Sequence, residues 1–232
     1  MSRLHLPRPA HTHLAYLITL GLAALSALCA ALWPPPAHAT DTTKGKIPAA
    51  PDGLAIAGRA LAAARCAGCH GLDGNSIDSA YPKLAGQLET FLDLQLRNYR
   101  SGERPHPGMA AVSRTLSDME IRAVSRHYAG QAPMWSEGPF DPVLLRRGEA
   151  VFKLGKPGTP ACQYCHGARG QGLAPVFARL AGQHPEFIVA SLQPYRREST
   201  FGNPYAYVMK AVVQGWTDDD IRAVAAYVGS LR

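Results

Sequence analysis

The pentapeptide CAGCH occupies residues 66–70, and CQYCH occupies residues 162–166, 96 positions further along the chain. A second repeated segment follows each pentapeptide: KLAGQ at 83–87 after the first and RLAGQ at 179–183 after the second. Repetition at a fixed period is the sequence signature of a duplicated structural unit. The sequence therefore predicts two copies of one small unit, each built around a Cys-x-x-Cys-His motif.

The first 39 residues have the features of an export signal. A weakly basic start precedes an apolar run of 20 residues, from Leu14 to Trp33, and PPPAHA follows it. Ala37-His38-Ala39 fits the small-x-small cleavage rule. The alternative is an uncleaved membrane anchor, because the run is long enough to span a bilayer. The prolines directly after the run favour cleavage after Ala39, so we predict a periplasmic protein with a signal peptide at 1–39.

Loss of Cys29 with the signal would leave four cysteines, all of them in the two pentapeptides. An even number in an exported protein usually indicates disulfides, but here a histidine follows each pair. A dithiol redox motif belongs to an α/β domain, and no segment of this chain alternates convincingly with the period of a strand. A zinc site drawn from both pairs would use four thiolates and leave both histidines without a role. Covalent haem attachment, for which Cys-x-x-Cys-His is the signature, explains all three residues.

The spacing suits that chemistry. Two thiols three positions apart lie on one face of a helical turn, where they can bond the two vinyl groups of a haem. The next residue then directs its imidazole at the iron. We therefore predict two covalently bound haem c groups, attached through Cys66, Cys69, Cys162 and Cys165. His70 and His166 are the predicted proximal ligands.

The internal repeat also selects the second axial ligand of each iron. MAAVSRTLSDMEIRAV at 109–124 aligns with MKAVVQGWTDDDIRAV at 209–224, which places Met109 on Met209. Met119 aligns with an aspartate, and Met134 has no counterpart. Core packing is the ordinary interpretation of a methionine, but equal placement in both copies favours Met109 and Met209 as ligands. His/Met ligation closes the iron and raises its potential, which suits an electron carrier.

The remaining histidines of the two units are not expected to be ligands. His106 and His184 lie beside prolines, so we expect them in solvated loops. His127 occupies the position that Tyr227 has in the second copy, so we expect it to pack on a helix.

The segments around the motifs predict an all-α protein. Each copy has an Ala-rich or amphipathic helix before its motif, an amphipathic helix after LAGQ, a loop that carries the methionine, and a last helix capped by Ser117 or Thr217. A loop-rich stretch, QAPMWSEGPFDP at 131–142, separates the copies. We predict domains at 40–135 and 136–232. Units of this size are small for an independent core, and a haem would supply the missing apolar volume.

The two haem motifs, the paired LAGQ segments and the methionine followed eight residues later by SDMEI or TDDDI resemble the cytochrome c4 family. The resemblance covers about residues 50–232. It implies two fused c-type domains related by pseudo-twofold symmetry, with two His/Met haems facing each other and propionates near the seam. It also implies electron transfer between membrane respiratory complexes, often toward a terminal oxidase.

Two departures from the family pattern concern packing and the proximal histidine. A glycine of the first helix commonly packs against an aromatic residue of the last, as Gly148 and Tyr227 would, but Gly58 faces His127, so a looser crossing is expected in the first unit. A proline commonly follows each haem motif, where backbone carbonyls hold the histidine. Pro175 has that place in the second copy, Ser79 aligns with it in the first, and Pro82 lies out of register. The second methionine loop, RRESTFGNPYAYVM, is also longer. These departures predict unequal haem potentials.

Composition limits the classes of partner. The chain has 24 basic and 17 acidic residues, a net charge of +7 that falls to +5 without residues 1–39. This charge is too mild and too evenly spread to predict a nucleic-acid groove. We predict an electron carrier rather than an enzyme, which meets membrane respiratory complexes or periplasmic redox proteins. It would be peripheral to the membrane, or anchored if the signal stays. The alternatives are a cytochrome subunit of a dehydrogenase and a dihaem enzyme such as a peroxidase or a thiosulfate-oxidising cytochrome.

Overall fold

The structure is a computed structural model that describes residues 53–197 and 204–232. The predicted signal segment, Cys29 and part of the longer methionine loop lie outside the described residues. No helix in the two described ranges is long and apolar enough to cross a membrane.

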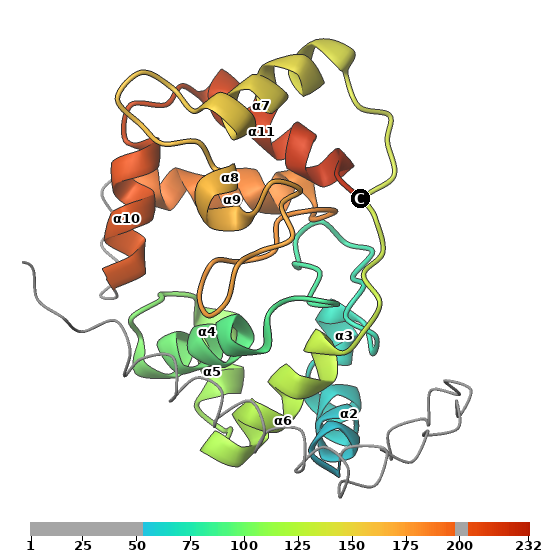
Figure 1. The fold of residues 1–232 in the computed structure, drawn as a ribbon. Helices are drawn as coiled ribbons and strands as arrows, with labels where there is room; N and C mark the ends of the chain where they lie inside the picture. Colours follow the sequence, from blue (N-terminus) through green and yellow to red (C-terminus); the bar gives the residue numbers. More distant parts are fainter. Residues whose placement is uncertain (1–52, 198–203) are drawn as a thin grey trace, which may run out of the picture. The chain divides into compact units, whose positions relative to one another are not determined.

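The helices of the described residues follow the same order in two successive repeats (Figure 1). The first repeat contains α2 (Gly53–Arg65), α3 (Ala67–His70), α4 (Glu89–Ser101), α5 (Pro107–Ser113) and α6 (Asp118–Ala129). The second contains α7 (Pro142–Leu154), α8 (Gln163–His166), α9 (Pro185–Arg196), α10 (Pro204–Val213) and α11 (Asp218–Ser230). Within these ranges the backbone forms no strand, only two isolated bridges. The predicted all-α class is confirmed.

The last helix of each repeat begins with the predicted capping box. The Ser117 hydroxyl accepts a hydrogen bond from the Glu120 N–H, and the Glu120 carboxylate accepts from the Ser117 N–H at 2.8 Å. Thr217 and Asp220 form the same reciprocal pair at the start of α11. These bonds satisfy N–H groups that a helix start leaves without a partner. They therefore define where α6 and α11 begin.

The first and last helices of each repeat cross in close contact, and α7 and α11 lie side by side in Figure 1. A Cβ atom added to Gly148 would lie 2.0 Å from the Ala223 carbonyl oxygen, and one added to Gly58 would lie 2.0 Å from that of Ala123. The expectation of a looser crossing in the first repeat is wrong. The approach is backbone to backbone, so replacing the aromatic residue by His127 does not open it.

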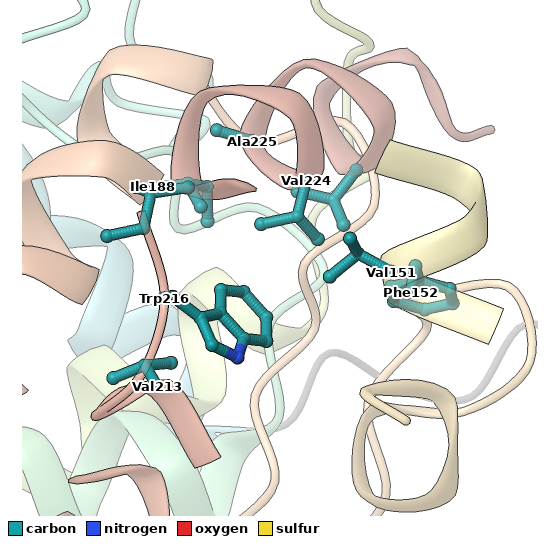
Figure 2. Close-up of a cluster of buried hydrophobic side chains, with 9 residues drawn as sticks. Val151, Phe152, Ile188, Val213, Trp216, Val224 and Ala225 are labelled. Atoms are coloured by element: carbon teal, nitrogen blue, oxygen red, sulfur yellow. The ribbon is translucent and has the colours of Figure 1, made fainter. Parts of the chain in front are cut away.

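The larger core cluster belongs to the second repeat. Side chains from α7, α9, α10 and α11 converge there around Trp216, which is 5% exposed (Figure 2). The first repeat has Leu116 at the aligned position and a smaller cluster centred on Leu92 and Tyr128. Leu92 and Ile188 are both buried, as the predicted apolar faces of α4 and α9 require. The two repeats therefore share a backbone plan but differ in how their interiors are filled.

The repeated LAG residues tie each loop to its own repeat. The Gly74 carbonyl accepts hydrogen bonds from the N–H groups of Leu84 and Ala85, and the Gly86 N–H donates to the Tyr128 carbonyl in α6. In the second repeat the Gly170 carbonyl takes the place of Gly74, with the same pattern. The loop after each haem motif is therefore held against the last helix by backbone bonds, which places the residue two positions before LAG, Pro82 or Ala178, beside the motif histidine.

Candidate haem sites

Each Cys-x-x-Cys-His motif forms a single helical turn. Cys66 precedes α3, and the His70 N–H donates to the Cys66 carbonyl at 3.0 Å. The His166 N–H donates to the Cys162 carbonyl at 2.9 Å in the same way. None of the four cysteines of the described residues forms a disulfide. The turn therefore presents two thiols and an imidazole from consecutive positions, as the spacing predicts.

One backbone carbonyl orients each motif histidine. Nδ1 of His70 donates to the Pro82 carbonyl at 3.0 Å, and Nδ1 of His166 donates to the Ala178 carbonyl at 2.8 Å. A carbonyl can only accept, so Nδ1 carries the proton and Nε2 is left as a neutral lone-pair donor. This is the arrangement that a histidine ligand of a metal usually has.

The prediction of which residue supplies the carbonyl acceptor for each histidine Nδ1–H was wrong. Pro82 and Ala178 both lie 12 residues after their histidine, so Pro82 is in register and supplies the acceptor. Pro175 does not bind His166; its carbonyl accepts a hydrogen bond from the Thr90 hydroxyl of the first repeat. The acceptor is a backbone group, so a proline at that position is not required.

Burial sets the ionisation of these groups. Burial raises the pKa of the Cys162 thiol to about 11 and also raises the pKa of the Cys66 thiol. Burial lowers the pKa values of His70 and His166, which keeps both imidazoles neutral. A neutral imidazole is the form in which histidine binds a metal ion such as haem iron.

The two predicted methionine ligands occupy equivalent short helices. Met109 lies in α5 and Met209 in α10, and both are partly buried. A loop was expected to carry them, so the helices are a correction. Met119 and Met134 are 58% and 56% exposed, which agrees with their exclusion. Ligation by Met109 and Met209 stays a prediction.

The other histidines have structural roles. His127 is buried in α6 with Nε2 2.8 Å from the Leu72 carbonyl, so the predicted packing role is confirmed. His106 is exposed, and its Nδ1 accepts from the Met109 N–H at the start of α5. His184 was expected to be solvated, but its Nε2 bonds the Ser76 carbonyl of the first repeat at 2.9 Å. It is therefore part of a contact between repeats.

Two glutamines that the sequence reasoning did not single out join the repeats. Gln183 Oε1 accepts from the Lys83 N–H at 2.9 Å, and its Nε2 donates to the Lys83 carbonyl at 2.9 Å. Gln87 makes the same pair of bonds with Arg179, at 2.7 and 3.0 Å. Reciprocal contacts of this kind are expected about a twofold axis. The only signal in the sequence was the repeated final residue of LAGQ.

The donor set fits a haem with its carboxylate groups. Among the described residues, four buried side-chain atoms have no hydrogen-bond partner in the protein: Ser113 Oγ and Ser125 Oγ in the first repeat, and Arg179 Nε and Trp216 Nε1 in the second. A buried donor without an acceptor costs about 1–3 kcal/mol, and the propionates of a haem are acceptors. With two thiols and a neutral imidazole in each repeat, the residues present fit one haem per repeat.

Comparison with known proteins agrees with this assignment. The family described as cytochrome c matches residues 145–232, and the family described as cytochrome c oxidase, cbb3-type, subunit III matches residues 53–127. Cytochrome c4 from Pseudomonas aeruginosa is 36% identical over 182 residues, covering 77% of this chain and 89% of the relative. A thiosulfate dehydrogenase electron acceptor from Stutzerimonas stutzeri is 32% identical over 180 residues, covering 73% of this chain and 80% of the relative.

The fold comparison points the same way. The crystal structure of reduced recombinant cytochrome c4 from Pseudomonas stutzeri superposes with a TM-score of 0.72 at 32% identity, covering 77% of this chain and 98% of that one. The two repeats are tandem cytochrome c domains related by pseudo-twofold symmetry, and each carries one covalently bound haem c. The chain belongs to the cytochrome c4 family of electron carriers.

Proposed function

We propose that this protein carries single electrons in the periplasm between components of a respiratory chain, with a terminal oxidase as the final acceptor. One observation carries the proposal: both haem sites are built alike, down to the carbonyl that holds each histidine. Two equivalent sites, each with a candidate sixth ligand, suit electron transfer better than catalysis, which needs an open iron. Export and respiratory partners follow from the leader-like segment and the family.

The proposed ligand sets are His70 with Met109, and His166 with Met209. Haem iron supplies a one-electron change between its ferric and ferrous states. The protein's part is to hold each imidazole by its Nδ1 proton and to offer a soft thioether, which favours the ferrous state. Thioether bonds from the four motif cysteines keep the cofactor in place. Little rearrangement is then needed when an electron arrives or leaves.

We further propose that residues 1–39 are a cleaved signal and that the two domains span 40–135 and 136–232. The structure supports a boundary in this region, because residues 130–141 between α6 and α7 form no helix. Mass spectrometry of the exported protein tests the cleavage: a mature chain beginning at Thr40 is expected, whereas retention of the apolar run would identify an anchor.

A second candidate is an electron-accepting subunit held by a dehydrogenase. It is favoured by the similarity to the thiosulfate dehydrogenase electron acceptor from Stutzerimonas stutzeri. The same two haem sites would serve either role. Stable co-purification of the untagged chain with a catalytic partner would favour the subunit. Purification alone, with rapid oxidation of the reduced protein by inner-membrane vesicles and inhibition by cyanide, would favour the free carrier.

The optical spectrum of the oxidised protein tests the ligands. Methionine bound to ferric haem gives a weak far-red band, and two such haems should give twice the intensity of one. Met109→Ala and Met209→Ala are each expected to remove half of the band and to open one iron to cyanide. Met119→Ala is the matched control, because that side chain is exposed on α6. A full band in either ligand variant would refute its assignment.

A further inference from the structure

A single peptide unit connects each proximal histidine to a glutamine of the other repeat. The Pro82 carbonyl that accepts from His70 Nδ1 belongs to the same peptide unit as the Lys83 N–H, which donates to Gln183 Oε1 at 2.9 Å. In the second repeat, the Ala178 carbonyl accepts from His166 Nδ1, and the N–H of the same peptide donates to Gln87 Oε1 at 2.7 Å. The two chains of hydrogen bonds have the same composition and cross the seam in opposite directions.

The glutamine side chains are held firmly in this geometry. Gln87 and Gln183 are 8% and 7% exposed. Each Oε1 also accepts from the next backbone N–H, that of Leu88 or His184, at 3.0 Å. Each Nε2 donates to a carbonyl of the opposite repeat. Both ends of each amide are therefore bonded, which leaves no alternative orientation with the same number of bonds.

Hydrogen bonds in series polarise one another, and the effect is stronger where water is excluded. A peptide whose N–H is engaged has a more negative carbonyl oxygen, which is a better acceptor for the histidine Nδ1–H. A stronger acceptor makes the imidazole a more basic ligand. A more basic ligand stabilises ferric iron relative to ferrous iron, and the reduction potential falls.

We propose that Gln87 and Gln183 are positioning residues that tune the reduction potential of the haem in the opposite repeat. Gln183 acts through the 82–83 peptide on the iron bound by His70, and Gln87 acts through the 178–179 peptide on the iron bound by His166. This inference rests on the proposed ligation by both histidines. The seam between the domains then has an electronic role as well as a structural one.

The test is a redox titration of the holoprotein with Gln183→Met or Gln87→Met, which keep side-chain length but lose both hydrogen bonds to the opposite repeat and the bond from the next backbone N–H. Gln183→Met is expected to shift the ferric–ferrous equilibrium of the His70 haem about tenfold toward ferrous, a rise of about 59 mV for a one-electron couple. The His166 haem should not change. Gln87→Met should give the reverse pattern. In the reduced protein, the NMR signal of the affected histidine Nδ1–H should move upfield, which identifies the haem.

Two control variants separate tuning from loss of the seam. Gln183→Glu keeps an acceptor oxygen for the Lys83 N–H, so the potential of the His70 haem should not rise. Thr90→Val removes the bond between repeats to the Pro175 carbonyl, which is not the carbonyl that holds a histidine, so both potentials should stay.

Three results would overturn the proposal. They are equal shifts of both haems, a shift confined to the haem of the substituted repeat, and a rise in Gln183→Glu equal to that in Gln183→Met. A wild-type protein without the far-red band would overturn the proposed ligation as well. An intact band without the crossed shift would overturn the tuning alone.

Discussion

Replacing Gly58 by alanine tests whether the first helix crossing is as close as the structure shows. The new Cβ would lie 2.0 Å from the Ala123 carbonyl oxygen and 2.9 Å from the His127 Cβ. A carbon–oxygen contact in proteins is about 3.3 Å at its closest. The nearest atom belongs to the backbone and cannot rotate away, so α2 and α6 must move apart by about 1 Å.

The size of that displacement determines how much the free energy of unfolding falls. A gap of about 1 Å loses up to half of the attraction at each contact across the crossing, which places the cost near the upper end of overpacking, about 3 kcal/mol. Alanine returns about 1 kcal/mol through its higher helix propensity. The net loss in the free energy of unfolding is therefore about 2 kcal/mol.

Denaturant unfolding of the holoprotein, followed by helical circular dichroism and haem absorbance, measures this loss. Gly53→Ala is the matched control, because it lies on the same helix and its Cβ would meet no atom within 4 Å. Gly148→Ala is expected to cost as much as Gly58→Ala, since its Cβ would also lie 2.0 Å from a carbonyl oxygen. A Gly58→Ala protein within about 0.5 kcal/mol of wild type, beside a strongly destabilised Gly148→Ala protein, would refute the equal crossings.

Three further predictions concern pH and the cofactor. Burial alone would raise the pKa of Asp220, but hydrogen bonds from Lys156, the Thr217 cap and Arg147 lower it below its ordinary value, so its contribution to stability is complete above about pH 4 and is lost as pH falls. Asp220→Asn should cost about 2 kcal/mol at neutral pH and weaken the acid dependence of the urea midpoint. Glu120→Gln, at the less buried counterpart, should have a smaller effect on both, and equal losses of stability in the two variants would contradict this prediction. Burial lowers the pKa of His184, so its contribution to the free energy of unfolding is present above about pH 6.5 and is lost as pH falls below that value. His184→Gln should therefore weaken the dependence of the urea midpoint on pH in this range, and an unchanged dependence would exclude His184 as its cause. Replacing the four motif cysteines by alanine should give an unfolded or molten chain, and a cooperative calorimetric transition would show that haem is not needed for the fold.

Local features of this fold were predictable from the residues. The Cys-x-x-Cys-His turns, the capping boxes at Ser117 and Thr217, and the apolar faces that bury Leu92 and Ile188 all lie where the sequence places them. Each depends on neighbours within one or two turns of helix, where side-chain chemistry and spacing are sufficient.

Two predictions taken from the usual family pattern were wrong, and in both the deciding contact is made by backbone atoms. Pro175 was expected to hold the second histidine because prolines are common in that loop, yet the Ala178 carbonyl does so. Every residue has a backbone carbonyl, so the residue that supplies the acceptor cannot be recognised from its side chain. The same reason explains Gly58, whose close contact is with the backbone of Ala123 and is indifferent to the neighbouring histidine.

The order of the amino acids is enough to show which residues can attach two haems and that the chain consists of two helical copies, because covalent attachment and helix periodicity are local properties. The packed fold is needed to assign the carbonyl that orients each histidine and to show that Gln87 and Gln183 bind the opposite repeat. The glutamine bonds join residues about 100 positions apart in the sequence. Each histidine bond reaches a backbone carbonyl 12 positions away. No pattern of side chains specifies such partners before the loops and the two domains have packed together.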